Sequence, residues 1–314
     1  MRRALALTVA WALAACASES LFGEVEDLGG SFIWAEGPVW VESDGGYLLF
    51  TDVPGKTIWR YDDSGGLSKW MNPSTLPGAK VRDGASGANG LALLDDDTLL
   101  VPDHGSRTLY ALNLQSRDVR VLAGEYEGSR FHSPNDVTIA SDGSLYFTDP
   151  PYGLAEPDTD ASREIGVNGV YRLRPDGTIV LIDGQHSRPN GIALSPDERT
   201  LYVSNSNPEA TYWAYDLDAD GEVVGESRLL ADLTEMRERA GYGNPDGLAV
   251  ARDGRIFATG PGGLVVLSPD GVVVDELSVG KPCANVTFGG EGRDTLYLTC
   301  QDRLFRVRTT ARGL

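Results

Sequence analysis

Basic residues are scarce in this chain of 314 residues. It has 27 lysines and arginines against 46 aspartates and glutamates, so its formal net charge is −19 at pH 7. A surface of this sign repels phosphate backbones and anionic membranes, which need Lys and Arg to neutralise them. The deficit therefore argues against a nucleic-acid partner and favours cations.

Long apolar runs are missing as well. Beyond the N-terminus no stretch approaches the ~20 apolar residues that a membrane-spanning helix needs. The one apolar run, from Ala4 to Ala15, follows two arginines and is too short for a resident span, a pattern typical of a signal peptide. It ends in Leu13-Ala14-Ala15-Cys16, which resembles the lipobox of bacterial lipoproteins, where the cysteine is lipidated.

These features predict that residues 1–16 are a lipoprotein-type signal peptide and residues 17–23 a linker. The protein would then be exported, and either periplasmic or tethered to a membrane only through a lipid anchor at Cys16. The alternative is a plain signal peptide that happens to contain a cysteine. The sequence leaves the oligomeric state open.

Cysteine and histidine are too few and too widely spaced for several common motifs. The three cysteines form no C-x-x-C pair, and His104, His132 and His186 form no H-E-x-x-H, so zinc sites of these kinds are not indicated. No G-x-S-x-G occurs, and a serine hydrolase triad therefore has no support.

Glycine and proline, with 38 and 17 residues, are by contrast frequent enough for many turns. One pattern recurs six times: a short apolar strand, an acidic or glycine-rich turn and a second apolar strand. The copies are spaced ~40 to 55 residues apart without helical periodicity between them, which is typical of an all-β, six-bladed β-propeller. They are Ala35–Asp52, Gly87–Asp103, Ser133–Asp149, Ser187–Asn205, Asn244–Gly260 and Cys283–Cys300.

Residues 24–314 are therefore expected to form a single propeller domain. The segment from Glu24 to Ile33 precedes the first copy and would supply the outer strand of the sixth blade. Such a strand closes the ring and removes exposed sheet edges. A short helical insertion is expected near Leu233 to Arg239.

An amide or a carboxylate stands just before the first strand in every copy. The first strands of the blades run side by side around the central channel, so six oxygen-bearing side chains should converge at one mouth. They are Glu36, Asn89, Asn135, Asn190, Asp246 and Asn285. For a single copy, such as Pro189-Asn190-Gly191, the simpler interpretation is turn chemistry, because Asn and Gly tolerate positive φ.

Carboxylate and amide oxygens without thiolates suit a hard divalent cation. The sequence thus predicts a central metal site, with Ca²⁺ as the first candidate and Mg²⁺, Mn²⁺ or Zn²⁺ as alternatives. Glu36 and Asp246 would balance the charge of the ion. Two other interpretations stay open: a cation that only holds the ring together, or amides that hydrogen-bond across the channel without a metal.

Several motifs together carry a family resemblance. The set EGPVW, SPNDV, RPNGIALSPD, NPDGLAV and CANVTFGG…LYLTC resembles the gluconolactonase/regucalcin (senescence marker protein) family of six-bladed propellers, and more distantly diisopropylfluorophosphatase. The resemblance covers the chain from about Glu24 to Arg308. It implies a hydrolase that opens a sugar lactone, such as gluconolactone, to its aldonic acid with the help of a divalent metal.

The resemblance also implies roles for individual residues. Glu36, Asn190 and Asp246 would bind the metal, and Asn135 would either be a further ligand or orient the hydroxyl groups of the substrate. Asp246 is the general base of the mechanism proposed for the family, although a carboxylate bound to a cation is a poor base. Asn89 and His104 are further candidates for substrate binding.

One position departs from the family pattern. Animal regucalcins carry a substrate-binding Arg where this chain has Ser133. The departure therefore concerns the contacts to the sugar and not the metal ligands. The segments Leu154–Gly166 and Asn72–Arg82 are expected to form a lid, and His104 and His132 could relay a proton at the channel mouth.

Two further function classes stay open. One is hydrolysis of an organophosphate or another ester by a propeller of the same type, and the other is a non-catalytic propeller that binds partners through its loops. Two carboxylates in the channel favour catalysis, because a scaffold has no need of them.

Cys283 and Cys300 lie in the last copy. If the turn Gly289–Asp294 joins Phe288 to Thr295 as the end pair of a hairpin, the two cysteines are directly opposite, with Cα atoms roughly 4.5–5.5 Å apart. A looser turn would shift the register and point the thiols to opposite faces. In an exported protein we expect a disulfide that fastens the final blade; two buried free thiols are the alternative.

Overall fold

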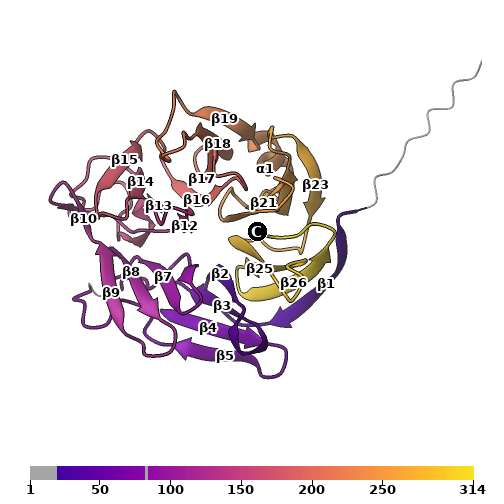
Figure 1. The fold of residues 1–314 in the computed structure, drawn as a ribbon. Coiled ribbons are helices and arrows are strands. Elements are labelled where there is room, and N and C mark those ends of the chain that lie inside the picture. Colours follow the sequence, from indigo (N-terminus) through magenta and orange to yellow (C-terminus); the bar gives the residue numbers. More distant parts are fainter. Residues whose placement is uncertain (1–19, 82–83) are drawn as a thin grey trace, which may run out of the picture.

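Six four-stranded antiparallel sheets surround a central axis in the computed structural model of the protein, which describes residues 20–81 and 84–314 (Figure 1). The predicted all-β, six-bladed propeller is confirmed. The expected signal peptide with Cys16, most of the expected linker and the end of the Asn72–Arg82 loop lie outside the described residues.

The strands of each blade follow one another from the channel to the rim. The first blade is β2 (Ala35–Val41), β3 (Tyr47–Asp52), β4 (Thr57–Asp62) and β5 (Gly66–Met71), and the second is β6 (Ala92–Asp95), β7 (Thr98–Asp103), β8 (Thr108–Asn113) and β9 (Val119–Ala123). The third blade is β12 (Val137–Ile139), β13 (Leu145–Asp149), β14 (Gly169–Leu173) and β15 (Ile179–Asp183), and the fourth is β16 (Pro189–Leu194), β17 (Thr200–Asn205), β18 (Thr211–Asp216) and β19 (Arg228–Asp232). The fifth blade is β20 (Leu248–Val250), β21 (Ile256–Gly260), β22 (Gly263–Leu267) and β23 (Val273–Leu277). The sixth blade is β24 (Asn285–Gly289), β25 (Thr295–Cys300), β26 (Arg303–Thr309) and β1 (Phe22–Gly29). A hairpin of β10 (Glu125–Tyr126) and β11 (Ser129–Arg130) follows the second blade.

The N-terminal strand closes the ring. β1 pairs with β26, with Val25 opposite Val307, and Thr310 N donates to Leu21 O at 3.0 Å. The beginning and the end of the described chain thus meet in one blade. The strand begins at Phe22 and not at Glu24, so the last two residues of the expected linker belong to the sheet.

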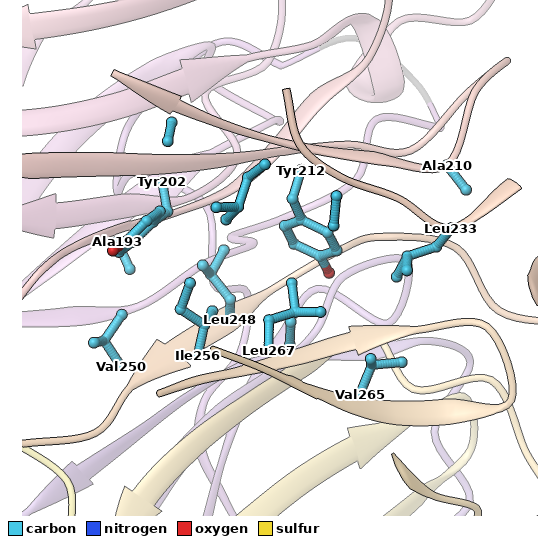
Figure 2. Packing of buried hydrophobic residues seen from close by; sticks show 14 residues of the cluster. Ala193, Tyr202, Ala210, Tyr212, Leu233, Leu248, Val250, Ile256, Val265 and Leu267 are labelled. Carbon is cyan, nitrogen blue, oxygen red and sulfur yellow. The ribbon is translucent and has the colours of Figure 1, made fainter. Parts of the chain in front are cut away.

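The hydrophobic cores lie between neighbouring blades, because each sheet is covered on both faces. Between the fourth and fifth blades, the fully buried Tyr212 and Ile256 belong to a cluster of apolar side chains drawn from both sheets (Figure 2). The Tyr212 hydroxyl is paired, since it donates to Thr259 O at 2.5 Å. Burial of one large apolar side chain contributes about 1.5–3 kcal/mol, so the stacking of blades holds the ring together.

Hydroxyl groups on second strands fasten one blade to the next. Thr148 Oγ1 donates to the carbonyl oxygen of Asn190 at 2.6 Å, and Ser204 Oγ donates to that of Asp246 at 2.8 Å. Both acceptors belong to the ring of oxygen-bearing residues predicted from the repeat. These bonds therefore fix the backbone that carries the candidate site.

Glycine follows several ring residues because the inner strands approach one another closely. A Cβ atom at Gly191 would lie 2.2 Å from Asp246 O, and one at Gly247 would lie 1.9 Å from Asn285 Cγ. Asn190 and Gly191 lie inside β16, and not in a turn. The simple interpretation of Pro-Asn-Gly as turn chemistry is therefore wrong: glycine stands here because no side chain fits between neighbouring blades.

Cys283 and Cys300 form a disulfide bond, with Cα atoms 3.8 Å apart. The predicted hairpin register is wrong by one residue, because Gly289 and not Phe288 lies opposite Thr295. The bond forms nevertheless, since Cys283 precedes β24 and its position is not set by the strand pairing. It joins the entrance of the innermost strand to the end of β25.

The helical insertion was predicted within one residue of its place, as α1 (Thr234–Ala240). Two short 3₁₀ turns, η1 (Ser43–Gly45) and η2 (Pro151–Gly153), complete the helical elements of the described residues. No helix in residues 20–81 and 84–314 has the length and apolar character to cross a membrane.

Candidate active site

A pocket of about 330 Å³ opens at one mouth of the central channel. Five of the six predicted ring residues line it: Glu36, Asn89, Asn135, Asn190 and Asp246. The sixth, Asn285, lies behind this wall and donates Nδ2 to Glu36 Oε2 at 3.1 Å. The fold thus brings together residues that come from six different blades.

Glu36 in β2 and Asp246, just before β20, place two carboxyl groups side by side in the pocket. Glu36 is buried, and Asp246 is half-buried with part of its surface open to the pocket. Burial raises the pKa of both groups, and the charge of Glu36 raises that of Asp246 further. A hydrogen bond between the two carboxyls favours the proton on Asp246. The pair therefore keeps a proton to a higher pH than either carboxyl would alone.

The donor atoms around this pair fit a hard divalent cation. Asp246 Oδ1 and Asn89 Oδ1 are buried and have no hydrogen-bond partner, an arrangement that is costly unless something else binds them. The pocket offers carboxylate, amide and hydroxyl oxygens and no thiolate, and hard oxygens are the ligands that Ca²⁺ prefers. Within the described part of the chain no three Asp, Glu, His or Cys side chains come together as a metal site. A cation here would rest on two carboxylates and neutral amides.

His104, one residue beyond β7, lies buried in the pocket wall and orients two of these amides. Its Nε2 is 3.2 Å from Asn89 Nδ2 and 3.4 Å from Asn135 Nδ2. Burial lowers the pKa of His104 to about 3, so the ring is neutral and its Nε2 accepts from both amides. This leaves both amide oxygens free to face the pocket. The ring holds the amides in place and is not suited to relay a proton.

Asn190 is held from the opposite side. Its Nδ2 donates to Ser206 Oγ at 3.0 Å, and Ser206 in turn donates to Pro245 O at 2.7 Å. The amide also forms a hydrogen bond that lowers the pKa of Asp246. With its nitrogen engaged in this way, the carbonyl oxygen of Asn190 is the atom left for a ligand in the pocket.

The other two histidines lie elsewhere. The ring of His132 is buried, with Nε2 2.9 Å from Ile165 O, and it does not line the pocket. His186 Nε2 lies 2.6 Å from the hydroxyl of Tyr215, in the fourth blade. The idea that His132 relays a proton at the mouth therefore finds no support in the geometry.

The expected lid segments are not part of the pocket wall, and their role as a lid stays a prediction. Neither Leu154–Gly166 nor residues 72–81 line the pocket; the side chain that does so on this side is Tyr152, in η2. The repeat did not single out the residues that extend the pocket beyond the ring, because they lie just before first strands or after second strands. They are Trp34, Val53, Pro54, Ser86, Tyr152, Ser206, Asn207 and Asn244.

A larger cleft of about 880 Å³ lies at the rim between the first and sixth blades. Its charged residues are largely paired with one another: Arg306, for example, forms ion pairs with Glu26 at 2.6 Å and with Asp63 at 2.5 Å. Among the described residues, the buried side-chain oxygens of Asn89 and Asp246 that have no partner lie in the channel pocket and not in this cleft. We therefore place the active site in the channel.

A family model described as SMP-30/Gluconolactonase/LRE-like region matches residues 34–302, which include all six inner strands and the whole pocket. The chain belongs to this gluconolactonase family. A gluconolactonase of Zymomonas mobilis is 38% identical over 296 residues, covering 92% of this chain and 82% of that protein. A rabbit regucalcin is 27% identical over 269 residues, covering 84% and 82% of the two chains.

A solved structure agrees with the family membership. The gluconolactonase of Xanthomonas campestris superposes with a TM-score of 0.78 at 28% identity, covering 91% of this chain and 89% of that one. The relatives confirm the expectation of a lactone-hydrolysing enzyme of the gluconolactonase family.

Proposed function

We propose that the protein is a divalent-metal-dependent hydrolase that opens a sugar lactone, such as gluconolactone, to its aldonic acid. The observation that carries the proposal is the pair Glu36 and Asp246, two carboxyls with raised pKa values in one pocket, where the buried Oδ1 atoms of Asp246 and Asn89 have no hydrogen-bond partner. The 38% identity to a gluconolactonase supports the substrate class. Ca²⁺ is the first candidate for the ion, because every donor is a hard oxygen.

A cation bound by Glu36, Asn190 and Asp246, with Asn135 as a further ligand or substrate contact, would polarise the lactone carbonyl and lower the pKa of a water molecule. Glu36 contributes charge and is fixed from behind by Asn285 and by Gly37 N, which donates to Glu36 Oε2 at 2.7 Å. Such support from outside the pocket keeps the carboxylate in one orientation.

Once a cation has displaced the proton shared with Glu36, Asp246 would take the proton of the attacking water. Its Oδ1 has no hydrogen-bond partner, and its raised pKa brings the carboxylate closer to the basicity that proton abstraction needs. Water would then add to the lactone carbonyl carbon, the ring C–O bond would break, and the leaving alkoxide would take the proton from Asp246 to become the free hydroxyl of the acid. Binding to a cation would lower the basicity of Asp246, so the chemistry favours its role as a metal ligand over its role as a general base.

Hydrolysis of D-glucono-δ-lactone by the purified protein tests the proposal directly. Acid release is followed in a weakly buffered solution after treatment with EDTA and again after addition of Ca²⁺, Mg²⁺, Mn²⁺ or Zn²⁺. We expect turnover above the spontaneous rate that is lost with EDTA and restored by one or more of these ions. No enzymatic acceleration with any ion would refute the proposal and favour a binding scaffold.

We also propose that the protein is exported and held at a membrane through Cys16. The support is the sequence alone, in which a short apolar run behind two arginines ends in Leu-Ala-Ala-Cys.

A further inference from the structure

Tyr152 is held over the channel pocket by a firmly anchored turn. The hydroxyl of the buried Ser133 donates to Pro150 O at 2.5 Å and accepts a hydrogen bond from Gly153 N at 2.9 Å. A Cβ atom at Gly153 would lie 2.7 Å from Ser133 Cβ and 2.8 Å from His104 Cβ, so the turn is seated without a gap against the pocket wall. The position of Tyr152 is thus fixed before any ligand arrives.

The hydroxyl of Tyr152 is a hydrogen-bond donor at the upper edge of the pocket. It lies within hydrogen-bonding reach of Ser206 and Asn207. Burial raises the pKa of Tyr152 to about 12, and the nearby charge of Asp246 acts in the same direction, so the phenol keeps its proton. A hydrogen bond with Asn207 lowers the pKa of Tyr152, as a bond donated to the phenol oxygen does, so the hydroxyl proton is left for a ligand.

Two amides continue this edge around the mouth. Asn207 and Asn244 line the pocket, and their Oδ1 atoms face Arg237 Nη1 at 3.5 and 3.4 Å, while Arg237 Nη2 donates to Pro208 O at 2.8 Å. The long contacts to the guanidinium turn the NH₂ groups of both amides away from it. Tyr152, Asn207 and Asn244 therefore add neutral donors to a pocket whose carboxyl groups come from Glu36 and Asp246.

From this arrangement we infer that Tyr152 is a substrate-binding residue that donates a hydrogen bond to a hydroxyl group of a neutral, polyhydroxylated lactone of monosaccharide size. The inference rests on the proposed lactonase function and deepens it. The pocket volume of about 330 Å³ is near the lower end of the ~300–1,000 Å³ range of ligand sites, which suits a single sugar unit. No Lys or Arg lines the pocket among the described residues, so an anionic substituent would find no partner there.

The test compares two substrates and two tyrosine variants. Tyr152→Phe removes only the hydroxyl, and Tyr146→Phe is the matched control, because Tyr146 lies in the same blade, has a pKa raised to about 12 and donates to Gly221 O away from the pocket. The substrates are D-glucono-δ-lactone, which has hydroxyl groups, and δ-valerolactone, which has the same ester ring without them.

For Tyr152→Phe we expect a 5- to 10-fold increase in KM for gluconolactone, about the value of one neutral hydrogen bond, with kcat nearly unchanged. Its kcat/KM for δ-valerolactone and its melting temperature should match those of the wild type, and Tyr146→Phe should leave both KM values unchanged. An unchanged KM for gluconolactone, or an equal loss with both lactones, would overturn the inference. A wild-type protein inactive on every lactone would instead refute the proposed function.

Discussion

The carboxyl groups of Glu36 and Asp246 share a hydrogen bond in the channel although they belong to the first and fifth blades. Two such groups repel each other when both are ionised, and burial strengthens the repulsion. A proton can hold them together, and so can a divalent cation. A proton and a divalent cation therefore compete for this pair of carboxyl groups.

Glu36→Gln and Asp246→Asn should each lower kcat/KM for the lactone by about 100-fold or more, because each removes a charged oxygen ligand from a hard cation. Isothermal titration with Ca²⁺ should show weaker binding in both variants. Asn89→Ala is the control in the same wall, and its loss should be about tenfold or less. Wild-type turnover with full metal occupancy in either carboxylate variant would mean that the metal site is assigned wrongly.

Stability of the metal-free protein should fall as pH rises. The pKa values of Glu36 and Asp246 are raised in the folded state above their ordinary values of 4.5 and 3.8, so the folded state binds protons more tightly than the unfolded state. The resulting stabilisation is complete below pH ~4 and is lost as the pH rises through the raised values.

Thermal unfolding in EDTA between pH 4.5 and 8.5 measures this effect, with Asp246→Asn as the control. Asp136 and Asp149, with pKa values raised to about 7, contribute to the slope in both proteins. Asp136 also interacts with Glu36 and Asp246, so the difference between the two curves reports the loss of Asp246 together with its effect on these neighbours. The wild-type melting temperature should fall more steeply than that of the variant, and added Ca²⁺ should raise it most at high pH. Parallel curves would contradict the prediction.

The disulfide should stabilise the sixth blade. It closes a loop with a sequence separation of 17, for which the chain-entropy estimate is about 3 kcal/mol. Urea unfolding of Cys283→Ala/Cys300→Ala should show a loss of this order against the oxidised wild type. Thiol titration of the denatured, unreduced protein is an independent check: two reactive thiols from this pair would show that the bond is absent in solution.

Cys16→Ser should release the protein from membranes or leave its precursor unprocessed, because lipidation at this cysteine would be its only hold on a bilayer. Fractionation of cells that express the wild type and the variant measures the difference. Wild-type protein entirely in the soluble periplasmic fraction would rule out the anchor.

The inner strands and the ring of six polar residues could be predicted from the sequence because a repeat averages over six copies. Asn190 by itself suggested a turn; only its agreement with Glu36 and Asp246 in other copies pointed to the channel. Glycine follows these residues because the backbones of neighbouring blades approach closely there. This reason could not be predicted from the sequence, since it depends on how the blades are stacked.

Features outside the repeat were predicted less well. The hairpin register at Thr295 depends on the conformation of its turn, which a positive φ at Gly290 and at Arg293 shapes, and it was missed by one residue. Tyr152 stands in a Pro-rich turn with no counterpart in the other copies. Its role depends on Ser133 and Gly153, which seat the turn, and this contact joins residues that no pattern in the sequence connects.

The position of β1 on the rim of the disc determines how a tethered enzyme would face its surroundings (Figure 1). The chain enters the disc at Phe22, on the outer edge of the sixth blade, and not at either mouth of the channel. If Cys16 is anchored, the six residue steps from it to Phe22 span at most about 22 Å. The disc would then stand on its edge at the bilayer, with the mouth of the active site opening sideways into the aqueous phase, where water-soluble lactones diffuse.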